Sequence, residues 1–256
     1  MYNGIFITVR TGSTRLPNKA LIQINGKTTI EHLIDRVKRV YLPDVKVVLC
    51  TTLLPEDDVL CEIAKKNSIE YYRGSVEDKL DRWLGACVEH NIDFFVTADG
   101  DDLFCDPGLI DHAIRQYQQS LKKIDFIRAP GLICGAFTYG IKRSALEKVC
   151  EIKDSDNTEM HWVYFEDTGL FNVHNLQNVP EQYKRNDIRM TLDYEDDLKF
   201  FTNVIEHFGE QTFGLLAIIY YINENPEVAK INIHLEEQWA KNQKEKTTLK
   251  LKENNG

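Results

Sequence analysis

Short apolar runs alternate with helical patterns through the first half of this chain, and this alternation restricts the fold more than any other feature of the sequence. The apolar runs have the length and composition of buried strands, and they occupy residues 4–9, 45–50, 69–72 and 94–98. The segments between them carry apolar residues at helical spacing, and they occupy 29–41, 55–67 and 76–90. Strands that alternate with helices form a mainly parallel sheet covered by helices on both faces. The sequence therefore predicts a three-layer α/β fold.

The second half of the chain is less regular. Further strands are expected near 126, 136–141, 170–173 and 188–192, and further helices from Pro107 and over 144–150, 195–207 and 213–223. Because no long linker or internal repeat divides the chain, residues 1–239 are interpreted as one domain. Residues 240–256 are rich in Lys, Asn, Gln and Glu, so this tail is expected to be a frayed helix or disordered.

The net charge of the protein limits the classes of molecule that it can bind. The net charge is −9 and the pI is about 5.3, whereas a nucleic-acid-binding protein needs a basic surface to replace phosphate counterions. No apolar stretch approaches the roughly 20 residues of a membrane helix, and no signal-peptide pattern opens the chain. We therefore expect a cytoplasmic protein with neither nucleic acid nor membrane as a partner. The six cysteines are expected to be free thiols.

A basic segment follows the first predicted strand, in a stretch of 30 residues that has no acidic side chain. Arg10, Arg15 and Lys19 offer charge-assisted hydrogen bonds to phosphate oxygens. Gly12 allows close approach to the backbone, and Ser13 adds hydroxyl and N–H donors. The segment lacks both the P-loop and the dinucleotide-binding patterns. It predicts a cradle for a compact polyanion such as a triphosphate, and the alternative is an ordinary solvated basic loop.

The same segment carries a resemblance to a known family. Residues 10–19 read Arg-Thr-Gly-Ser-Thr-Arg-Leu-Pro-Asn-Lys, which closely resembles the signature of the cytidylyltransferases that make CMP-activated acidic sugars. These include the CMP-KDO synthetases and the spore-coat polysaccharide F-type cytidylyltransferases. The family usually has glycine in place of Asn18, and asparagine tolerates the left-handed backbone region better than most residues. The resemblance runs from Gly4 to about Phe208 and implies a nucleotide-diphospho-sugar transferase-like (GT-A-like) fold, often dimeric, that binds CTP and Mg²⁺.

An acidic turn follows the strand predicted at 94–98. Clustered carboxylates repel one another unless a cation lies among them, and a hard divalent ion such as Mg²⁺ is the usual partner. The resemblance places the metal aspartate of the family at Asp101, although a leucine stands where the family has its first proline. It leaves open whether Asp99 or Asp102 also contacts the metal. Asp106 is expected to cap the helix that begins at Pro107.

A second acidic string lies at residues 189–198 and resembles the family's Arg-x-Thr-Val-Asp-x-Pro-Glu-Asp-Leu. The resemblance gives Asp193 the role of second metal carboxylate. The family's proline is absent here, because Tyr194 stands in its place. The acids from Glu195 to Asp197 are interpreted as residues of a first helical turn, where they interact favourably with the helix dipole.

Two weaker matches concern the nucleotide base and the acceptor. Residues 72–82 resemble the family segment beside the base, which implies that Arg73 and Ser75 contact CTP; Ser75 is also the expected cap of the 76–90 helix. Glu159 matches a family position in the second half. His161 is shifted by one from the family's histidine, so it is either an acceptor-site residue or a structural one.

The predicted reaction is attack of an acceptor oxygen on the α-phosphate of CTP with departure of pyrophosphate. Arg10, Arg15 and Lys19 are expected to bind the β- and γ-phosphates, helped by backbone N–H groups of the same loop, while Asp101 and Asp193 hold Mg²⁺. The catalytic residues are predicted to be Arg10, Lys19 and Asp101. The implied partners are CTP, a small anionic sugar or related phosphate or phosphonate acceptor of glycoconjugate or surface polysaccharide biosynthesis, and a second copy in a homodimer.

The sequence leaves open two functions other than nucleotidyl transfer. Asp99-Gly100-Asp101 spells the Asp-x-Asp motif with which metal-dependent glycosyltransferases hold a nucleotide diphosphate. Such enzymes do not need a basic triphosphate loop, so the basic segment favours nucleotidyl transfer. The other alternative is an inactive nucleotide-binding module, which the departures from the family pattern at Leu103 and Tyr194 would favour.

Overall fold

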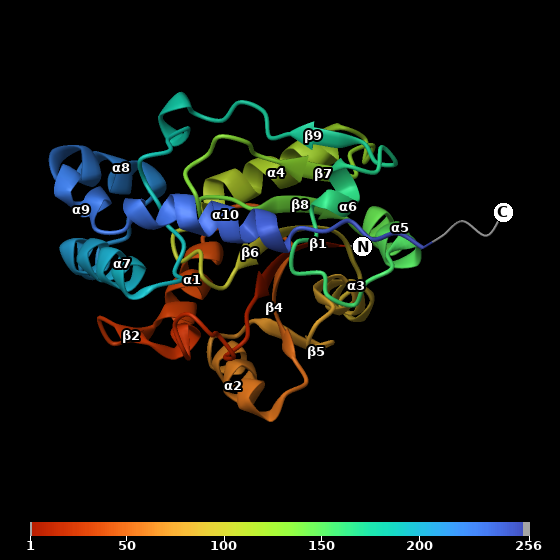
Figure 1. The fold of residues 1–256 in the computed structure, drawn as a ribbon, viewed down its shortest axis with the longest axis horizontal. Coiled ribbons are helices and arrows are strands. Elements are labelled where there is room, and N and C mark those ends of the chain that lie inside the picture. Colours follow the sequence, from red (N-terminus) through yellow and green to blue (C-terminus); the bar gives the residue numbers. More distant parts are fainter. Residues whose placement is uncertain (1, 253–256) are drawn as a thin grey trace.

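A central sheet organises the protein, and it contains seven strands among residues 2–252, which the computed structural model describes (Figure 1). In spatial order the strands are β5 (Glu70–Gly74), β4 (Val45–Thr52), β1 (Tyr2–Thr8), β6 (Ile92–Asp99), β8 (Tyr139–Lys142), β7 (Phe126–Arg128) and β9 (Val173–Asn175). The first four are mutually parallel, whereas β8 runs antiparallel to both β6 and β7. The predicted mainly parallel sheet is thus confirmed, with an antiparallel strand inserted beside β6.

Helices cover both faces of the sheet. One face packs against α1 (Thr29–Val37), α2 (Asp58–Lys66) and α4 (Pro107–Gln119), and the other against α3 (Lys79–Glu89), α5 (Arg143–Ile152) and α6 (Val163–Glu166). Alternation along β1 explains this division, because successive strand side chains point to opposite faces. Ile5 and Ile7 belong to the first core, and Phe6 belongs to the second, where it stacks on Phe95 with ring centroids 4.2 Å apart.

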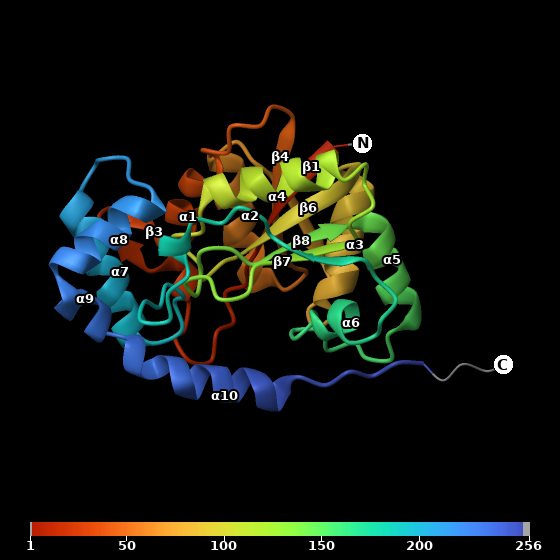
Figure 2. The same ribbon diagram turned by 90° about the horizontal axis from the view of Figure 1, so that it is seen from above.

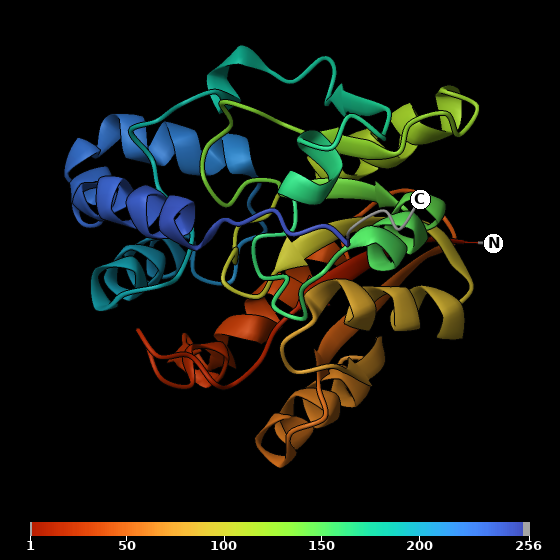
Figure 3. The same cartoon turned by 45° about the vertical axis from the view of Figure 1, so that its right-hand side comes forward.

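The remaining helices lie at one end of the molecule and across its front. Helices α7 (Glu195–Phe208), α8 (Leu215–Glu224) and α9 (Pro226–Lys230) gather at one end, and α5 lies towards the opposite side (Figure 3). Helix α10 (Glu236–Lys246) runs from this group towards α6 and α5 (Figure 2). A two-stranded hairpin, β2 (Gln23–Ile24) with β3 (Lys27–Thr28), precedes α1. No helix among residues 2–252 has both the length and the apolar character required to cross a membrane.

Two elements differ from the sequence prediction. Helix α3 begins at Lys79 and not at Val76, because Asp78 is its cap and accepts a hydrogen bond from the Asp81 amide at 3.1 Å. Ser75 instead accepts from the Asp78 amide, so it shapes the preceding turn. The segment predicted as a strand at 188–192 forms only an isolated bridge between Arg189 and Cys134, because no neighbouring strand continues the pairing.

The polar tail is helical over much of its length. Of the two alternatives for residues 240–256, the structure shows a helix as far as Lys246, and the boundary expected after residue 239 falls inside α10. Two acidic residues, Glu236 and Glu237, stand in its first turn, where they interact favourably with the helix dipole. The chain then pairs near the end of α5, where Leu251 forms a bridge with Lys153. Residues 253–256 lie outside the described part of the chain.

Candidate active site

A cavity of about 930 Å³ opens beyond the carboxyl ends of the parallel strands. Ligands of open α/β sheets bind at this edge. The basic loop after β1 and the acidic loop after β6 meet here because β1 and β6 are adjacent and parallel, with Thr8 paired to Asp99. Gly100 makes the approach possible, since a Cβ at this position would lie 2.7 Å from the Val9 side chain. Segments from both halves of the chain and from α10 complete the walls.

Lys19 joins the three sequence clusters in the cavity. Its Nζ donates hydrogen bonds to Asp101 Oδ2 at 2.8 Å, to Asp193 Oδ1 at 2.9 Å and to the Leu192 carbonyl oxygen at 2.7 Å. Arg15 Nη2 lies 2.6 Å from the same Asp193 oxygen. The basic loop and two carboxylates from distant parts of the sequence therefore converge on one point, as the sequence predicted.

Burial and mutual charge set the protonation of this cluster. Burial acts to lower the pKa of Lys19, but Asp101 and Asp193 outweigh it, so the pKa is raised and the ammonium stays charged. Burial acts to raise the pKa of Asp193, but Lys19 and Arg15 outweigh it, so the pKa is lowered and the carboxylate stays ionised. Burial raises the pKa of Asp102 well above its ordinary value, and neighbouring Asp101 and Asp99 add to the effect. Burial also raises the pKa of Asp101, against the opposing effect of Lys19.

Asp193 is held rigidly by the residues around it. Asp197 accepts hydrogen bonds from the amides of Asp193 and Tyr194 at 2.9 and 3.0 Å, and it binds buried Arg189. Asn232 donates to the same carboxylate at 2.8 Å. The role of Asp197 thus exceeds the helix-dipole interaction expected for it, because it fixes the backbone that carries Asp193. Because these hydrogen bonds already fix the backbone at Asp193, less conformational entropy is lost when a cation or a ligand binds there.

The donor set of the cluster suits a hard divalent cation. Among residues 2–252, no group of three or more His, Cys, Asp and Glu side chains is placed to hold a metal ion. The carboxylates of Asp101 and Asp193 nevertheless already share one cationic partner, the Lys19 ammonium. Mg²⁺ is commonly held by one or two protein carboxylates, with waters and phosphate oxygens as its other ligands. Two converging carboxylates beside a basic loop match that pattern.

Comparison with known proteins decides the family, because residues 5–231 match the family described as Cytidylyltransferase. The chain belongs to the cytidylyltransferase family. It is 30% identical over 235 residues to an uncharacterized protein of Methanocaldococcus jannaschii, and the match covers 91% of this chain and 95% of that protein. It is 26% identical over 228 residues to the spore coat polysaccharide biosynthesis protein SpsF of Bacillus subtilis, with coverage of 87% and 95%.

Solved structures agree with the family. A cytidylyltransferase from Leptospira borgpetersenii superposes with a TM-score of 0.80 at 28% identity, over 90% of this chain and 97% of that one. A CMP:2-keto-3-deoxy-manno-octonic acid synthetase, solved with CTP, has a TM-score of 0.62 at 15% identity, over 81% and 99%, and shares the fold. The protein is therefore a nucleotidyltransferase, and the resemblance carried by residues 10–19 is confirmed.

The basic loop of this cytidylyltransferase is shaped by contacts outside its motif. Asp57 Oδ1 accepts hydrogen bonds from both the amide and the hydroxyl of Thr11, at 2.8 and 2.7 Å. Asn18 has a φ of 54°, so it adopts the left-handed conformation expected where relatives carry glycine. The Ser13 amide donates to the Thr11 carbonyl oxygen at 2.8 Å, and the Ser13 hydroxyl accepts from the Leu16 amide at 3.4 Å. Sequence reasoning missed Asp57, because its role depends on a contact 46 residues away.

The other predicted ligand residues divide into two groups. Arg10, Gly12 and Ser13 line the cavity, and Arg10 is exposed at its edge. Arg73 lies outside the cavity lining: it donates to the carbonyl oxygens of Thr52 and Leu54 and pairs with a carboxylate of α2. Ser75 is likewise absent from the lining. In this structure these two residues stabilise the turns after β4 and β5.

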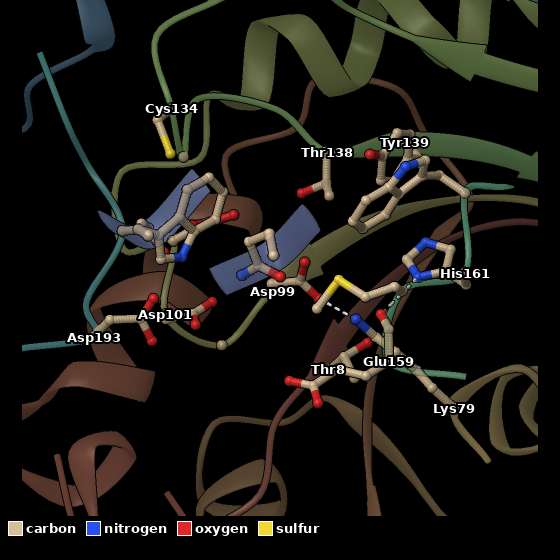
Figure 4. A pocket seen from close by; sticks show the side chains of 18 of the residues that line it. Thr8, Lys79, Asp99, Asp101, Cys134, Thr138, Tyr139, Glu159, His161 and Asp193 are labelled. Carbon is tan, nitrogen blue, oxygen red and sulfur yellow. Dashed lines mark hydrogen bonds and ion pairs between the residues drawn. The ribbon is translucent and has the colours of Figure 1, made fainter. Parts of the chain in front are cut away.

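The far side of the cavity has its own charged and aromatic groups (Figure 4). Lys79, which sequence reasoning did not single out, lies 3.0 Å from Asp99 and binds it. His161 is buried between Trp83 and Tyr139, with ring centroids 4.7 and 5.3 Å away. Burial lowers the pKa of His161 to about 3, and nearby Lys79 acts in the same direction, so the imidazole is neutral. His161 also lines the cavity, with 2% of its surface exposed.

A helix cap and the cysteines agree with the sequence prediction. Asp106 caps α4, as predicted, by accepting a hydrogen bond from the Leu109 amide at 3.0 Å. All six cysteines are free, as predicted.

Proposed function

We propose that this cytidylyltransferase transfers CMP from CTP to a small anionic sugar, or to a related phosphate or phosphonate acceptor, in a Mg²⁺-dependent reaction that releases pyrophosphate. The observation that carries the proposal is the convergence of Lys19 with Asp101 and Asp193 in the cavity. A basic loop beside two carboxylates is the arrangement that a triphosphate bound with a divalent cation requires. Family membership favours nucleotidyl transfer over the glycosyltransferase alternative.

In the proposed reaction, an acceptor oxygen forms a bond to the α-phosphorus as the bond from that phosphorus to the bridging oxygen of pyrophosphate breaks. Arg10, Arg15 and Lys19 offset the negative charge that develops on the leaving group. They come from one loop, which the Thr11–Asp57 contact holds in place. Transfer of this kind needs little covalent work from the protein, so positioning and charge neutralisation account for most of the catalysis.

Asp101 and Asp193 are the residues proposed to hold Mg²⁺. When bound there, the ion supplies charge neutralisation at the phosphates. Lys19 forms ion pairs with the same two carboxylates. We expect this ammonium to contact phosphate oxygens once a cation replaces it between the aspartates, since the side chain is flexible and carries three donors.

The names of relatives support the substrates. SpsF of Bacillus subtilis is named for spore coat polysaccharide biosynthesis. A 3-deoxy-manno-octulosonate cytidylyltransferase of Geobacter metallireducens is 30% identical over 110 residues, which cover 42% of this chain. These relatives support an anionic sugar acceptor and a role in surface polysaccharide or glycoconjugate synthesis. We also propose a cytoplasmic homodimer, and the six free cysteines agree with a reducing compartment.

Pyrophosphate release tests the proposal. The protein is mixed with CTP, Mg²⁺ and a panel of nonulosonic acids, 3-deoxy-manno-octulosonate, sugar phosphates and phosphonates. We expect release with at least one acceptor, and loss of release in Lys19→Ala and Asp101→Asn. Tight CTP binding without release on any acceptor would instead favour a nucleotide-binding module without activity. Release that persists in both variants would refute the roles assigned to these residues.

A further inference from the structure

The C-terminal segment, residues 236–252, crosses the active-site cavity and is called the strap below. It lies beyond residues 5–231, which match the family. At its start, Arg189 Nη1 donates to Glu236 Oε2 at 2.8 Å, and the Arg189 guanidinium lies 5.2 Å from the centroid of the Trp239 ring. At its other end, Lys252 donates from its amide to the Ile152 carbonyl oxygen at 2.9 Å. The strap is thus attached at both of its ends, and it runs from the side of α9 towards α5 (Figure 2).

One face of the strap is turned towards the cavity. The strap residues that line the cavity are Trp239, Ala240, Gln243, Lys244 and Thr247. Spacings of three and four positions place the first four along one side of α10, and Thr247 is the residue at which the helix ends. Lys241 and Glu245 do not line the cavity, and their charged groups are 3.9 Å apart. The cavity face therefore presents an indole, an amide, a hydroxyl and an ammonium to whatever fills the cavity.

Four buried polar atoms of the cavity lining have no hydrogen-bond partner among the described residues. One is Arg82 Nε in α3, and the other three are Gln243 Oε1 on the strap, Thr138 Oγ1 and His161 Nε2. A buried polar group left unsatisfied is destabilising, so groups of this kind in a cavity indicate a ligand or ordered water that completes them. Because the three atoms belong to separate segments, a ligand that satisfies all of them must carry several polar groups. A sugar with many hydroxyl groups has this chemistry.

The position of these atoms separates them from the phosphate cluster. In Figure 4, Asp101 and Asp193 lie on one side of Asp99, and Thr138 and His161 lie on the other. The first turn of the strap is bound to Arg189, whose Nη2 is 3.6 Å from Asp193 Oδ2, and Gln243 and Lys244 follow about two turns later. They therefore lie away from the site proposed for the triphosphate.

Lys244 brings a positive charge to this side of the cavity. It has no ion pair with a carboxylate elsewhere in residues 2–252, in contrast to Lys79 and Arg128, which are paired with Asp99 and Glu166. An unpaired ammonium at a cavity wall favours an anionic ligand.

We propose, on the basis of the proposed function, that the strap forms one wall of the acceptor subsite. Gln243 accepts a hydrogen bond from a hydroxyl of the acceptor, and Lys244 binds its anionic group. The strap residues then select the acceptor and leave nucleotide binding to the basic loop. Members of the family that differ after the matched region would differ in acceptor choice.

Acceptor kinetics of single variants test this inference. Gln243→Ala and Lys244→Ala are compared with Lys241→Ala, a matched control that removes a lysine of the same helix that does not line the cavity. The probe is the panel acceptor that gives pyrophosphate release with the wild-type protein. We expect each cavity-face variant to raise the acceptor KM about tenfold, as loss of one hydrogen bond to a charged or buried group would do. The KM for CTP should stay within twofold, and Lys241→Ala should change neither constant.

The outcomes separate the two proposals. If the wild-type protein releases pyrophosphate but both cavity-face variants keep the wild-type acceptor KM, the inference about the strap is wrong and the proposed function stands. A rise in the KM for CTP equal to the rise for the acceptor would also overturn it, because the strap would then serve the nucleotide. If the wild-type protein releases no pyrophosphate with any acceptor, the proposed function fails, and the inference fails with it.

Discussion

Lys19 and Asp193 are 174 positions apart in the sequence, yet Lys19 Nζ lies 2.9 Å from Asp193 Oδ1. The same nitrogen binds Asp101, so one ammonium neutralises two carboxylates that would otherwise repel each other. A divalent cation held by these aspartates would take the position of the ammonium between them. In the proposed function, Mg²⁺ would bind the oxygens that Lys19 now contacts, and this has a measurable consequence.

Replacement of Lys19 by methionine should separate stability from catalysis. The substitution leaves Asp101 and Asp193 without their shared cation, so we expect a loss of about 1–3 kcal/mol in unfolding free energy when EDTA is present. Mg²⁺ should then raise the melting temperature of Lys19→Met more than that of the wild type, because it restores a cation between the aspartates. Activity should fall by about 10²–10³-fold, the usual effect of removing one group that stabilises transition-state charge.

Lys27→Met is the control for this experiment. Lys27 belongs to the same basic stretch, but it lies on the surface and pairs with Asp35. We expect no change in its response to Mg²⁺. Equal Mg²⁺ responses of Lys19→Met and wild type would show that Asp101 and Asp193 do not hold the ion.

The Asp57 carboxylate should control nucleotide binding without touching the nucleotide. It accepts two hydrogen bonds from Thr11 and is buried, with 1% of its surface exposed. Asp57→Ala leaves these donors unpaired and frees the start of the basic loop, so we expect the KM for CTP to rise about tenfold and the melting temperature to fall. Steady-state kinetics and thermal unfolding measure the two effects. Glu56→Ala, at the exposed neighbouring position, should leave both unchanged; a wild-type KM in Asp57→Ala would contradict the positioning role.

Local sequence patterns were sufficient to predict the charged cluster and one helix cap. The cluster of Lys19, Asp101 and Asp193 was predictable because each residue follows a strand or a predicted strand, and parallel strands bring their carboxyl ends to one edge. The cap at Asp106 was predictable because proline at the first helical position restricts the alternatives.

Other features depend on contacts between distant parts of the chain. Asp57 gains its role only through Thr11, and Arg73 is turned towards the carbonyl oxygens of the turn after β4 by the packing of that turn. The polar composition of 240–256 suggested a weak helix or disorder, because no apolar face was visible. In the structure, Arg189 binds Glu236 and lies against the ring of Trp239, and these contacts hold the first turn of α10 at the site. Such attachment depends on three-dimensional context and leaves no periodic signal in the sequence.

His161 should make stability fall in mild acid. Burial lowers its pKa to about 3 in the folded protein, whereas an unfolded histidine has a pKa of about 6.5. Above about pH 6.5 the imidazole is neutral in both states and contributes no dependence on pH. As the pH falls below that value, the unfolded chain binds the proton first, so the free energy of unfolding decreases, by about 2 kcal/mol at about pH 5.

Denaturant titrations at about pH 7 and about pH 5 measure this loss. His161→Asn removes the titrating group, so the difference between the two pH values should shrink by about 2 kcal/mol. His174→Asn, at an exposed position, should leave the difference as it is in the wild type. An unchanged difference in His161→Asn would show that the imidazole titrates normally.

Arg189 should be among the most sensitive positions for stability. It is fully buried, and it binds Asp197 at 3.0 Å and Glu236 at 2.8 Å. Arg189→Met leaves the buried Asp197 carboxylate without its cation, so we expect a loss of about 3–5 kcal/mol. Arg185→Met removes a surface pair with Asp187 and should cost no more than about 1 kcal/mol. Chemical denaturation distinguishes the two, and equal losses would contradict the account of the Arg189 network.

Binding of CTP with Mg²⁺ tests the central claim most directly. Melting temperatures are measured for the wild type and for Asp193→Asn with CTP, UTP, GTP and ATP, each with Mg²⁺ and with EDTA. We predict that CTP raises the wild-type melting temperature more than the other three nucleotides do, that Mg²⁺ is required, and that Asp193→Asn loses the effect. A wild-type protein that does not respond to CTP with Mg²⁺, or an Asp193→Asn variant with the full wild-type response, would contradict it.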